Sequence, residues 1–557
     1  MKTVAIFYHQ EGYDTSSKRL MGRHAASEGF LRGLVRHSSS ERLYVYTNTE
    51  AEFEQFKQKI ASWTEQERQV NWISPDNPLS LARAGTYYRP DPIIGKFAWE
   101  RRYFDQNAYS ICGVTHTIAS KETIAAIGDL AIAPVQPWDA VICTSTAVKT
   151  AVNRILNDWG EYLASRVGSR PQIPLKLPVI PLGIDSESFL LSDNKKANAR
   201  QLRQELGIGP EDLVVLFVGR LIFHAKAHPV PLYLALEKAV KATKSKVHLI
   251  QAGWFEDSRQ EFSFKNCAAT FAPSVNHIFV DGRKAEIRSL IWSVADIFVS
   301  LADNIQETFG LTPIEAMAAG LPVIVSDWNG YKDTVRDRLD GFRIPSIAPA
   351  PGNGLDLAAN YWSNRLNYST YIGHASLTSA IDIEATAKAL TSLLTQPELR
   401  QKMGENGQKR AKQEYDWQVI ISQYEDLWQE LSELRTAGDT VAPITSNAPP
   451  HPLCDDPFAL FDRYPTQHLK DTHLLSLGDM YPPDRLNQIR TIWMTNFGDK
   501  LRSPATTIDE IIVAIATEGS LTVEEILNRY AGAEQFSRII LTRTLVYLLK
   551  FNVLRLL

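Results

Sequence analysis

The sequence has little cysteine, no long apolar run and almost no net charge. Its four cysteines are too widely spaced for a disulfide framework or a zinc site. No stretch approaches the roughly 18 apolar residues of a transmembrane helix, and the apolar run near the N-terminus is too short for a signal peptide. Lys and Arg number 59 against 63 Asp and Glu, so nothing attracts the chain as a whole to nucleic acid. We therefore expect a cytoplasmic protein without a nucleic-acid partner.

The composition indicates several folded domains. Hydrophobic residues make up 44% of the chain and charged residues 22%, which is ordinary for folded proteins and argues against a disordered or fibrous chain. At about 150 residues per domain, 557 residues predict three or four domain-sized units.

Short apolar runs alternate with amphipathic segments over the first 430 residues or so, which predicts parallel sheets covered by helices. The expected strands are 3–8, 43–47, 139–144, 214–219, 246–253, 277–282, 296–301 and 322–327. Prolines in 169–189 interrupt the pattern and predict a hinge-like connector. We expect two doubly wound α/β domains, residues 1–180 and 181–434, with a helix over 415–434 closing the second.

A different kind of unit is expected after the second domain. Residues 435–456 are rich in Pro, Ala and Thr and predict a linker, and 457–557 predict an accessory helical domain. Helix signals at 507–519, 522–532 and 537–550, followed by an apolar strand, are similar to a winged-helix outline. Residues 441–557 carry 11 Lys and Arg against 13 Asp and Glu, so a protein partner or self-association is favoured over DNA.

The most informative stretch is 300–330, where a strand, a polar loop and a helix follow one another. Thr312, Pro313 and Glu315 predict a helix start with Thr312 as N-cap and Glu315 completing a capping box. Gly310 permits close backbone approach beside free amides that bind anions. Glu315 and Glu307 either serve the cap and the solvent, or grip hydroxyl groups on the two sides of a diphosphate, as in a nucleotide sugar.

The spacing Glu307-TFGLTPI-Glu315 resembles the signature of the retaining glycosyltransferases of family 4, the group 1 type. Residues 214–221 and 181–189 are similar to the same family. The resemblance implies a GT-B fold, with two Rossmann-like domains across a cleft. It also implies that Glu307 contacts the transferred sugar and that Glu315 binds the ribose. The donor's diphosphate would be bound at the start of the helix, by Phe309, Gly310, Leu311 and Thr312.

Basic residues follow the strand 214–219. Negative charge grows on the leaving oxygen when a sugar–diphosphate bond breaks, and fixed cations stabilise it. An Arg fork and a Lys point charge can hold a diphosphate from two directions. The resemblance gives this role to Arg220 and Lys226, with Gly219 beside the donor. The alternative is a solvated basic loop.

Three histidines need separate interpretations. His224 and His228 are four apart and could share a helix face as metal ligands, but no third ligand accompanies them. The chain also has no DxD motif, so we expect neither a metal nor another cofactor. His116 follows a predicted strand of the first domain. A lone His is usually structural, whereas the resemblance places it in the cleft near the donor sugar.

Further candidates are less well defined. Gly330 is expected to allow tight backbone approach, and Asp333 belongs either to the cleft or to the surface. The others are Gly12, Gly22 and Arg23 near the acceptor or phosphate, Asn329 beside Gly330, and Trp254 and Phe279 near the nucleotide base.

The resemblance implies transfer of a sugar, with retained configuration, from a nucleotide sugar to an acceptor hydroxyl on a sugar, a lipid-linked sugar or a small molecule. Two alternatives remain. One is a non-catalytic nucleotide-sugar-binding or scaffold protein. The other is a sugar-nucleotide epimerase or a sugar phosphorylase on the same fold, although the chain shows no motif for the lysine that a phosphorylase needs.

Overall fold

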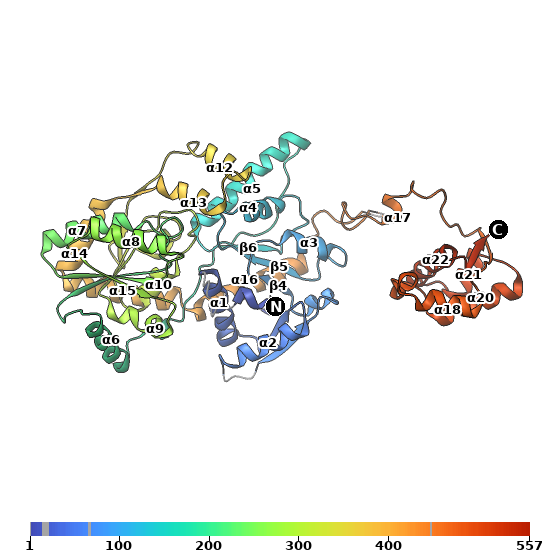
Figure 1. The fold of residues 1–557 in the computed structure, drawn as a ribbon, viewed down its shortest axis with the longest axis horizontal. Coiled ribbons are helices and arrows are strands. Elements are labelled where there is room, and N and C mark those ends of the chain that lie inside the picture. The colour runs from blue at the N-terminus through green and yellow to red at the C-terminus, as the bar shows by residue number, and fades with distance from the viewer. Residues whose placement is uncertain (1, 14–21, 65–67, 446–447) are drawn as a thin grey trace. The chain divides into compact units, whose positions relative to one another are not determined.

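The computed structural model describes residues 2–13, 22–64, 68–445 and 448–557. The chain divides into two compact units, Met1–Pro452 and Leu453–Leu557 (Figure 1). The break between them falls inside the segment 435–456 that the sequence predicts as a linker. No helix among the described residues is both long and apolar enough to cross a membrane.

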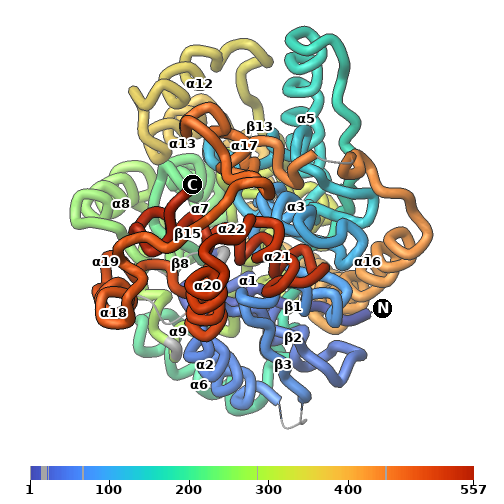
Figure 2. The backbone as a smooth tube through the Cα atoms, turned by 90° about the vertical axis from the view of Figure 1, so that its right-hand side faces the viewer, coloured from blue at the N-terminus to red at the C-terminus, as the bar shows by residue number. Residues whose placement is uncertain are grey.

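The first sheet has six parallel strands in the order β3-β2-β1-β4-β5-β6, with β1, β2 and β3 side by side in Figure 2. The strands are β1 (Ala5–Phe7), β2 (Arg42–Tyr46), β3 (Gln69–Ile73), β4 (Thr86–Arg89), β5 (Ser110–Val114) and β6 (Ala140–Ile142). Its helices are α1 (Gly22–His37), α2 (Glu50–Ala61), α3 (Gly95–Arg102), α4 (Lys121–Asp129) and α5 (Thr146–Val167), with short 3-10 turns η1 (Gln10–Tyr13) and η2 (Pro78–Arg83).

The second sheet repeats this winding, in the order β12-β11-β10-β7-β8-β9. The strands are β7 (Leu213–Val218), β8 (Val247–Gly253), β9 (Asn276–Asp281), β10 (Ile297–Ser300), β11 (Val323–Ser326) and β12 (Gly341–Ile344). Its helices are η3 (Ser186–Phe189), α6 (Asp193–Glu205), α7 (Pro229–Thr243), α8 (Ser258–Phe271), α9 (Ala285–Val294), α10 (Leu311–Ala318), α11 (Tyr331–Thr334), α14 (Ile383–Thr395) and α15 (Pro397–Glu414). The expectation of two doubly wound domains is confirmed.

A helical hairpin interrupts the second domain between β12 and α14. Its base is a two-stranded antiparallel ribbon of β13 (Ser346–Ile347) and β14 (Ala380–Ile381). Between these strands lie α12 (Leu355–Trp362) and α13 (Tyr368–Leu377). Figure 1 draws both helices beside α4 of the first domain.

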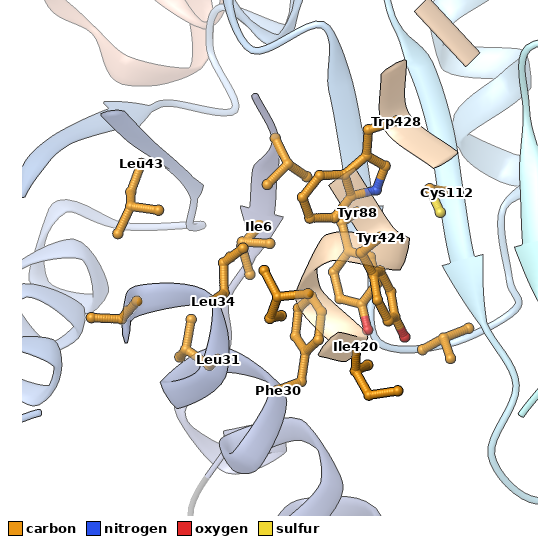
Figure 3. Packing of buried hydrophobic residues seen from close by; sticks show 14 of the residues in the cluster. Ile6, Phe30, Leu31, Leu34, Leu43, Tyr88, Cys112, Ile420, Tyr424 and Trp428 are labelled. Carbon is orange, nitrogen blue, oxygen red and sulfur yellow. The ribbon is translucent and has the colours of Figure 1, made fainter. Parts of the chain in front are cut away.

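Helix α16 (Trp417–Ala437) packs on the first sheet, so the prediction that 415–434 closes the second domain is wrong. Figure 3 shows Tyr424 and Trp428 of α16 against Phe30 and Tyr88 of the first domain. The amphipathic pattern identifies an apolar helix face, but it does not say which of two sheets covers that face.

The chain crosses between the two Rossmann-like domains twice, and the crossings lie side by side. Ile184 donates its amide to the Tyr415 carbonyl at 2.8 Å, and Trp417 donates to the Ile184 carbonyl at 3.0 Å. The predicted connector 169–189 contains the first crossing. The second, at Asp416, was not predicted.

The C-terminal unit has its own apolar core around Ile511, Ile526 and Leu545. The three predicted helices are confirmed as α20 (Ala505–Glu518), α21 (Val523–Tyr530) and α22 (Gln535–Lys550), and the terminal strand as β17 (Leu554–Leu556). Strand β17 joins β15 (Leu474–Leu477) and β16 (Leu521–Thr522) in the order β16-β15-β17. The remaining elements are α17 (Pro457–Leu460), α18 (Pro483–Thr491), α19 (Trp493–Asn496) and η4 (Asp499–Leu501).

Candidate active site

The predicted donor residues gather where the winding of the second sheet reverses. Strands β7 and β10 are parallel neighbours there, although five other elements separate them in sequence. Gly219, Arg220 and Lys226 follow β7, and Glu307 follows β10. The carboxyl ends of strands at such a reversal are where doubly wound sheets bind ligands.

Lys226 and Glu307 form an ion pair across these two loops. The Lys226 ammonium lies 2.8 Å from a carboxylate oxygen of Glu307, whose side chain is only 14% exposed. Burial alone would raise the pKa of Glu307, but the Lys226 charge and backbone hydrogen bonds from Thr308 and Phe309 outweigh it and lower that pKa. Glu307 is therefore an anion at neutral pH, beside a cation.

Buried Asn304, which is not among the predicted site residues, ties the two loops together. Its side-chain amide donates to the Lys226 carbonyl, and its carbonyl oxygen accepts from the amides of Gln306 at 3.0 Å and Glu307 at 3.3 Å. Asn329, from the loop after β11, donates to the Glu307 carbonyl at 2.9 Å. A polar residue between a buried strand and the Glu307 motif was the only signal for Asn304.

Arg220 is half-buried at the same place. Burial lowers its pKa, and the negative charges of Glu256 and Glu307 oppose that effect. Glu256, an exposed residue after β8, is a second carboxylate near the guanidinium that the sequence did not reveal. Lys226 pairs with Glu307, and Arg220 lies near enough for the same carboxylate to affect its pKa, so the predicted cations lie in one region of the site.

The start of α10 differs from the prediction. The N-cap is Gly310, with a φ of 89° and no side-chain cap, so Thr312 is not the N-cap and Glu315 completes no capping box. The predicted close approaches are present. A Cβ added to Gly310 would lie 2.0 Å from the Tyr331 ring, and one added to Gly330 would lie 2.6 Å from Cα of Phe309. The glycines decide the backbone path here, because no side chain fits.

The amides at the start of α10 are divided between two tasks. The Phe309 amide serves the Glu307 carboxylate, and the Phe309 ring is buried in the core. The role of the Phe309 amide at a diphosphate stays a prediction. Gly310, Leu311 and Thr312 remain at the helix N-terminus, where backbone amides attract an anion.

Glu315 lies one turn further along α10, and it is half-buried. Burial raises the pKa of its carboxyl to about 7. This carboxyl therefore changes charge near neutral pH, unlike Glu307. A perturbed carboxyl next to an anion-binding helix start is a binding-site feature.

The first domain meets the Glu307 loop directly. Thr117, which follows His116 after β5, donates its hydroxyl to the Gln306 carbonyl at 3.0 Å. Ser145 donates to the Thr308 carbonyl at 2.8 Å. The structure therefore places the predicted first-domain residue His116 next to the loop that carries Glu307.

Asp333 belongs to the contact between the two domains, so neither the cleft nor the open surface describes it. One of its carboxylate oxygens accepts from the Thr146 amide at 2.6 Å, at the first turn of α5. A carboxylate from the second domain thus stabilises a helix start of the first.

The two histidines after β7 have local roles. His228 is the N-cap of α7, and its Nδ1 accepts from the Val230 amide at 3.3 Å. His224 packs its Cβ against Gly373 of α13. Within the described parts of the chain, no group of three or more His, Cys, Asp or Glu is placed to hold a metal ion. The expectation of a metal-free reaction remains a prediction.

The remaining candidates are placed less informatively. A Cβ added to Gly12 or Gly22 would meet nothing within 4 Å, so neither glycine is required by a close contact. The Arg23 side chain lies outside the described residues. Trp254 lies beneath the Arg283 guanidinium, whose carbon is 5.6 Å from the ring centroid. Phe279 packs against Phe255 with ring centroids 5.7 Å apart.

Residues 198–349, which include every predicted site residue of the second domain, match the family model described as glycosyl transferases group 1. The chain is 27% identical over 269 residues to a D-inositol 3-phosphate glycosyltransferase of Geodermatophilus obscurus, covering 46% of this chain and 55% of that protein. It is also 27% identical over 203 residues to an alpha-monoglucosyldiacylglycerol synthase of Streptococcus pneumoniae, covering 36% of this chain and 41% of the other.

The chain spans about half the length of the curated relatives it matches. Among solved structures it is similar to Anabaena Alr3699/HepE in complex with UDP, at 16% identity and a TM-score of 0.49, covering 77% of this chain and 100% of that one.

Proposed function

We propose that this protein, whose residues 198–349 resemble the glycosyl transferases of group 1, is a retaining glycosyltransferase that uses a nucleotide sugar. The observation that carries the proposal is the half-buried Lys226–Glu307 pair beside the N-terminus of α10, at the reversal of the second sheet. Cations, helix amides and acidic groups are gathered there, and a nucleotide sugar needs all three.

Each group has a part in binding the donor. The amides at the start of α10 and the Arg220 guanidinium hold the diphosphate. Glu315 accepts hydrogen bonds from the ribose hydroxyls on one side of it. Glu307 accepts them from hydroxyls of the transferred sugar on the other side. Donor binding draws Lys226 from Glu307 toward the phosphate.

The chemical step breaks the bond between the anomeric carbon and the diphosphate oxygen. Lys226 and Arg220 stabilise the charge that grows on that oxygen. The acceptor hydroxyl attacks from the same face and gives its proton to the leaving oxygen, so the configuration is retained. A separate pair of acid and base carboxylates is then unnecessary, in contrast to glycosidases. His116 orients the sugar, and no metal ion takes part.

The acceptor is a hydroxyl on a sugar, a lipid-linked sugar or a small molecule. The names of the two relatives point to acceptors of different classes, so they do not select one. The loops after β5 and β6 meet the Glu307 loop from the first domain, and the acceptor therefore approaches from that side.

A screen of nucleotide sugars with mass detection of released nucleotide tests the proposal. We expect one base and sugar combination to give release, and a loss of at least tenfold in both Glu307→Ala and Lys226→Ala. A donor that binds and protects against thermal unfolding, but is not consumed, would indicate a binding protein instead. A donor that changes its sugar without releasing nucleotide would indicate an epimerase.

The C-terminal unit is proposed to associate with a protein partner or with a second copy of the chain, in the cytoplasm. Trp493, Met494 and Phe497 are each at least 74% exposed in and after α19. Replacing all three with Ser should remove any concentration-dependent increase of mass in sedimentation, while donor turnover stays unchanged.

A further inference from the structure

The α12–α13 hairpin has no part in the donor site described above, yet it touches several of the site's loops. The antiparallel β13–β14 pair fixes both ends of the hairpin to the second domain. Figures 1 and 2 both draw it close to α5 of the first domain. Its contacts therefore span the two domains whose relative placement the reaction needs.

One stripe of α13 makes these contacts. Tyr368, Ile372 and Ser376 are spaced four residues apart, so they lie on one face of the helix on successive turns. Tyr368 reaches the first domain at Thr117, and Ser376 reaches Asp303 at the end of β10. The opposite side of α13 carries His374, which is exposed.

Ile372 belongs to a small apolar cluster that is separate from the main cores. It is 1% exposed and packs with Ala119 of the first domain and with Ile222 and Ala225 from the loop that carries Arg220 and Lys226. Ile305, two residues before Glu307, packs against the same cluster. The cluster around Ile372 thus joins three loops that must keep fixed positions relative to one another for the proposed reaction.

The direction of the Tyr368 hydrogen bond follows from its partner. The Thr117 hydroxyl gives its single proton to the Gln306 carbonyl, so it can only accept from the Tyr368 hydroxyl, 3.3 Å away. Arg220 is close enough to Tyr368 to lower that phenol's pKa against the larger effect of burial. Tyr368 therefore completes a chain from α13 through Thr117 to the Glu307 loop, beside the cation proposed to hold the diphosphate.

Both ends of the hairpin are anchored at the site. At one end, Ser376 donates to buried Asp303 at 3.0 Å. At the other, the hydroxyl of Tyr361 on α12 accepts from the Lys121 amide, at the first turn of α4, at 3.1 Å. The Tyr361 ring stacks on Tyr371 of α13 with centroids 4.4 Å apart, so the two helices pack against each other.

We propose that α13 is a clamp that holds the acceptor-side loop against both donor loops, and that Tyr368 is a positioning residue for glycosyl transfer. This inference rests on the proposed function, because the loops have a reaction to perform only if the chain is a transferase. By excluding water and fixing Thr117 beside Gln306, the clamp favours transfer to the acceptor over hydrolysis of the donor.

Tyr368→Phe tests the clamp, since it removes only the hydroxyl and keeps the ring in the apolar cluster. The loss of one hydrogen bond should lower kcat for transfer about three- to tenfold. The donor KM should change less than twofold, and the ratio of donor hydrolysis to transfer should rise. A variant equal to wild type in kcat and in that ratio would overturn the proposal.

The matched control is Tyr371→Phe, the same change on the same helix. The Tyr371 hydroxyl makes no hydrogen bond with any residue the structure describes. This variant should match wild type in kcat and in the hydrolysis ratio. An equal loss in both variants would show that the Tyr368–Thr117 hydrogen bond is not responsible for the effect, and would overturn the positioning role.

Hydrogen exchange in the full chain separates failure of this inference from failure of the proposed function. Tyr368→Phe should speed amide exchange in residues 116–120 and 304–309 while the main unfolding temperature stays within about 2 °C of wild type. This readout needs no turnover. Unchanged exchange would refute the clamp even in an active transferase. Faster exchange in Tyr368→Phe, together with a wild-type protein that consumes no donor, would keep the clamp and refute the transferase.

Discussion

The Lys226 and Glu307 side chains depend on each other, and their pH behaviour should show it. In wild type the pKa of Glu307 is lowered, so the carboxylate is charged both folded and unfolded between pH 5 and 7. In Lys226→Met burial is no longer opposed by the cation, and the pKa of Glu307 should rise above its usual value. Compared with wild type at the same pH, the variant should then lose less stability at pH 5 than at pH 7.

Thermal unfolding at pH 5 and pH 7 checks this, together with donor turnover. The deficit in Tm of Lys226→Met should shrink as the pH falls, and turnover should drop about a hundredfold or more. Lys226→Arg keeps the charge and should lose less in both Tm and donor turnover. An equal deficit at both pH values would mean that the ion pair does not control Glu307.

The contribution of Glu315 to stability should depend on pH in the direction opposite to that of Glu307 in wild type. Burial raises its pKa to about 7, so its folded form favours the proton. The associated stability is complete below pH 4.5 and is lost as the pH rises through about 7. Glu315→Gln does not titrate, so its Tm relative to wild type should increase by about 1–3 °C between pH 5 and pH 8. Exposed Glu211→Gln should show no such trend, and a flat difference for Glu315→Gln would contradict the raised pKa.

At the residue scale, sequence alone located the charged groups but not their supports. Glu307, Arg220 and Lys226 belong to motifs with short, recognisable spacing. Asn304 and Tyr368 act through contacts between segments far apart in the chain, which spacing cannot reveal. The N-cap was misplaced because Gly310 and the nearby Tyr331 ring set the start of α10, rather than Thr312.

At the scale of single elements, the start of α10 should not tolerate a side chain at Gly310. Gly310→Ala forces a Cβ into the Tyr331 ring at a φ of 89°, so we expect a loss of about 1–3 kcal/mol in the free energy of unfolding, and weaker donor binding. Gly354→Ala is the control, since its Cβ would meet nothing within 4 Å. Urea unfolding of both variants measures the difference, and equal stability would show that the loop can shift freely.

Helix α16 should stabilise the first domain although it follows the second. Trp417 is 6% exposed and packs on glycines of α1, with a Cβ added to Gly33 only 2.8 Å from the Trp417 ring. Trp417→Ala should lower the free energy of unfolding by about 3–5 kcal/mol. Trp362→Ala, at 62% exposure, should cost far less. Similar losses in the two variants would contradict the packing of α16.

The elements show where sequence patterns suffice. Continuous apolar runs such as β7 and β8 are buried on both faces, and their positions were predicted closely. Strands β3 and β4 carry Asn71 and Tyr88 among few aliphatic residues, so no run marks them. The place of α16 depends on the chain's second crossing, and tertiary packing decides that crossing rather than local propensity.

At the scale of the whole molecule, the two compact units should unfold independently. The C-terminal unit has a separate core, so calorimetry of the full chain should resolve two transitions. A chain ending at Pro452 should lose one of them and keep donor turnover within about twofold of the full chain. Loss of the larger transition on truncation would show that the units depend on each other.

The central claim is that Arg220, Lys226 and the start of α10 form a nucleotide-sugar site. Titration of UDP, GDP and ADP into the protein, followed by calorimetry, tests it most directly. We predict that one nucleoside diphosphate binds with a 1:1 stoichiometry, that Lys226→Met weakens it at least tenfold, and that exposed Lys402→Met leaves it unchanged. Equal affinity in wild type and Lys226→Met, or no binding of any of the three nucleotides, would contradict the account.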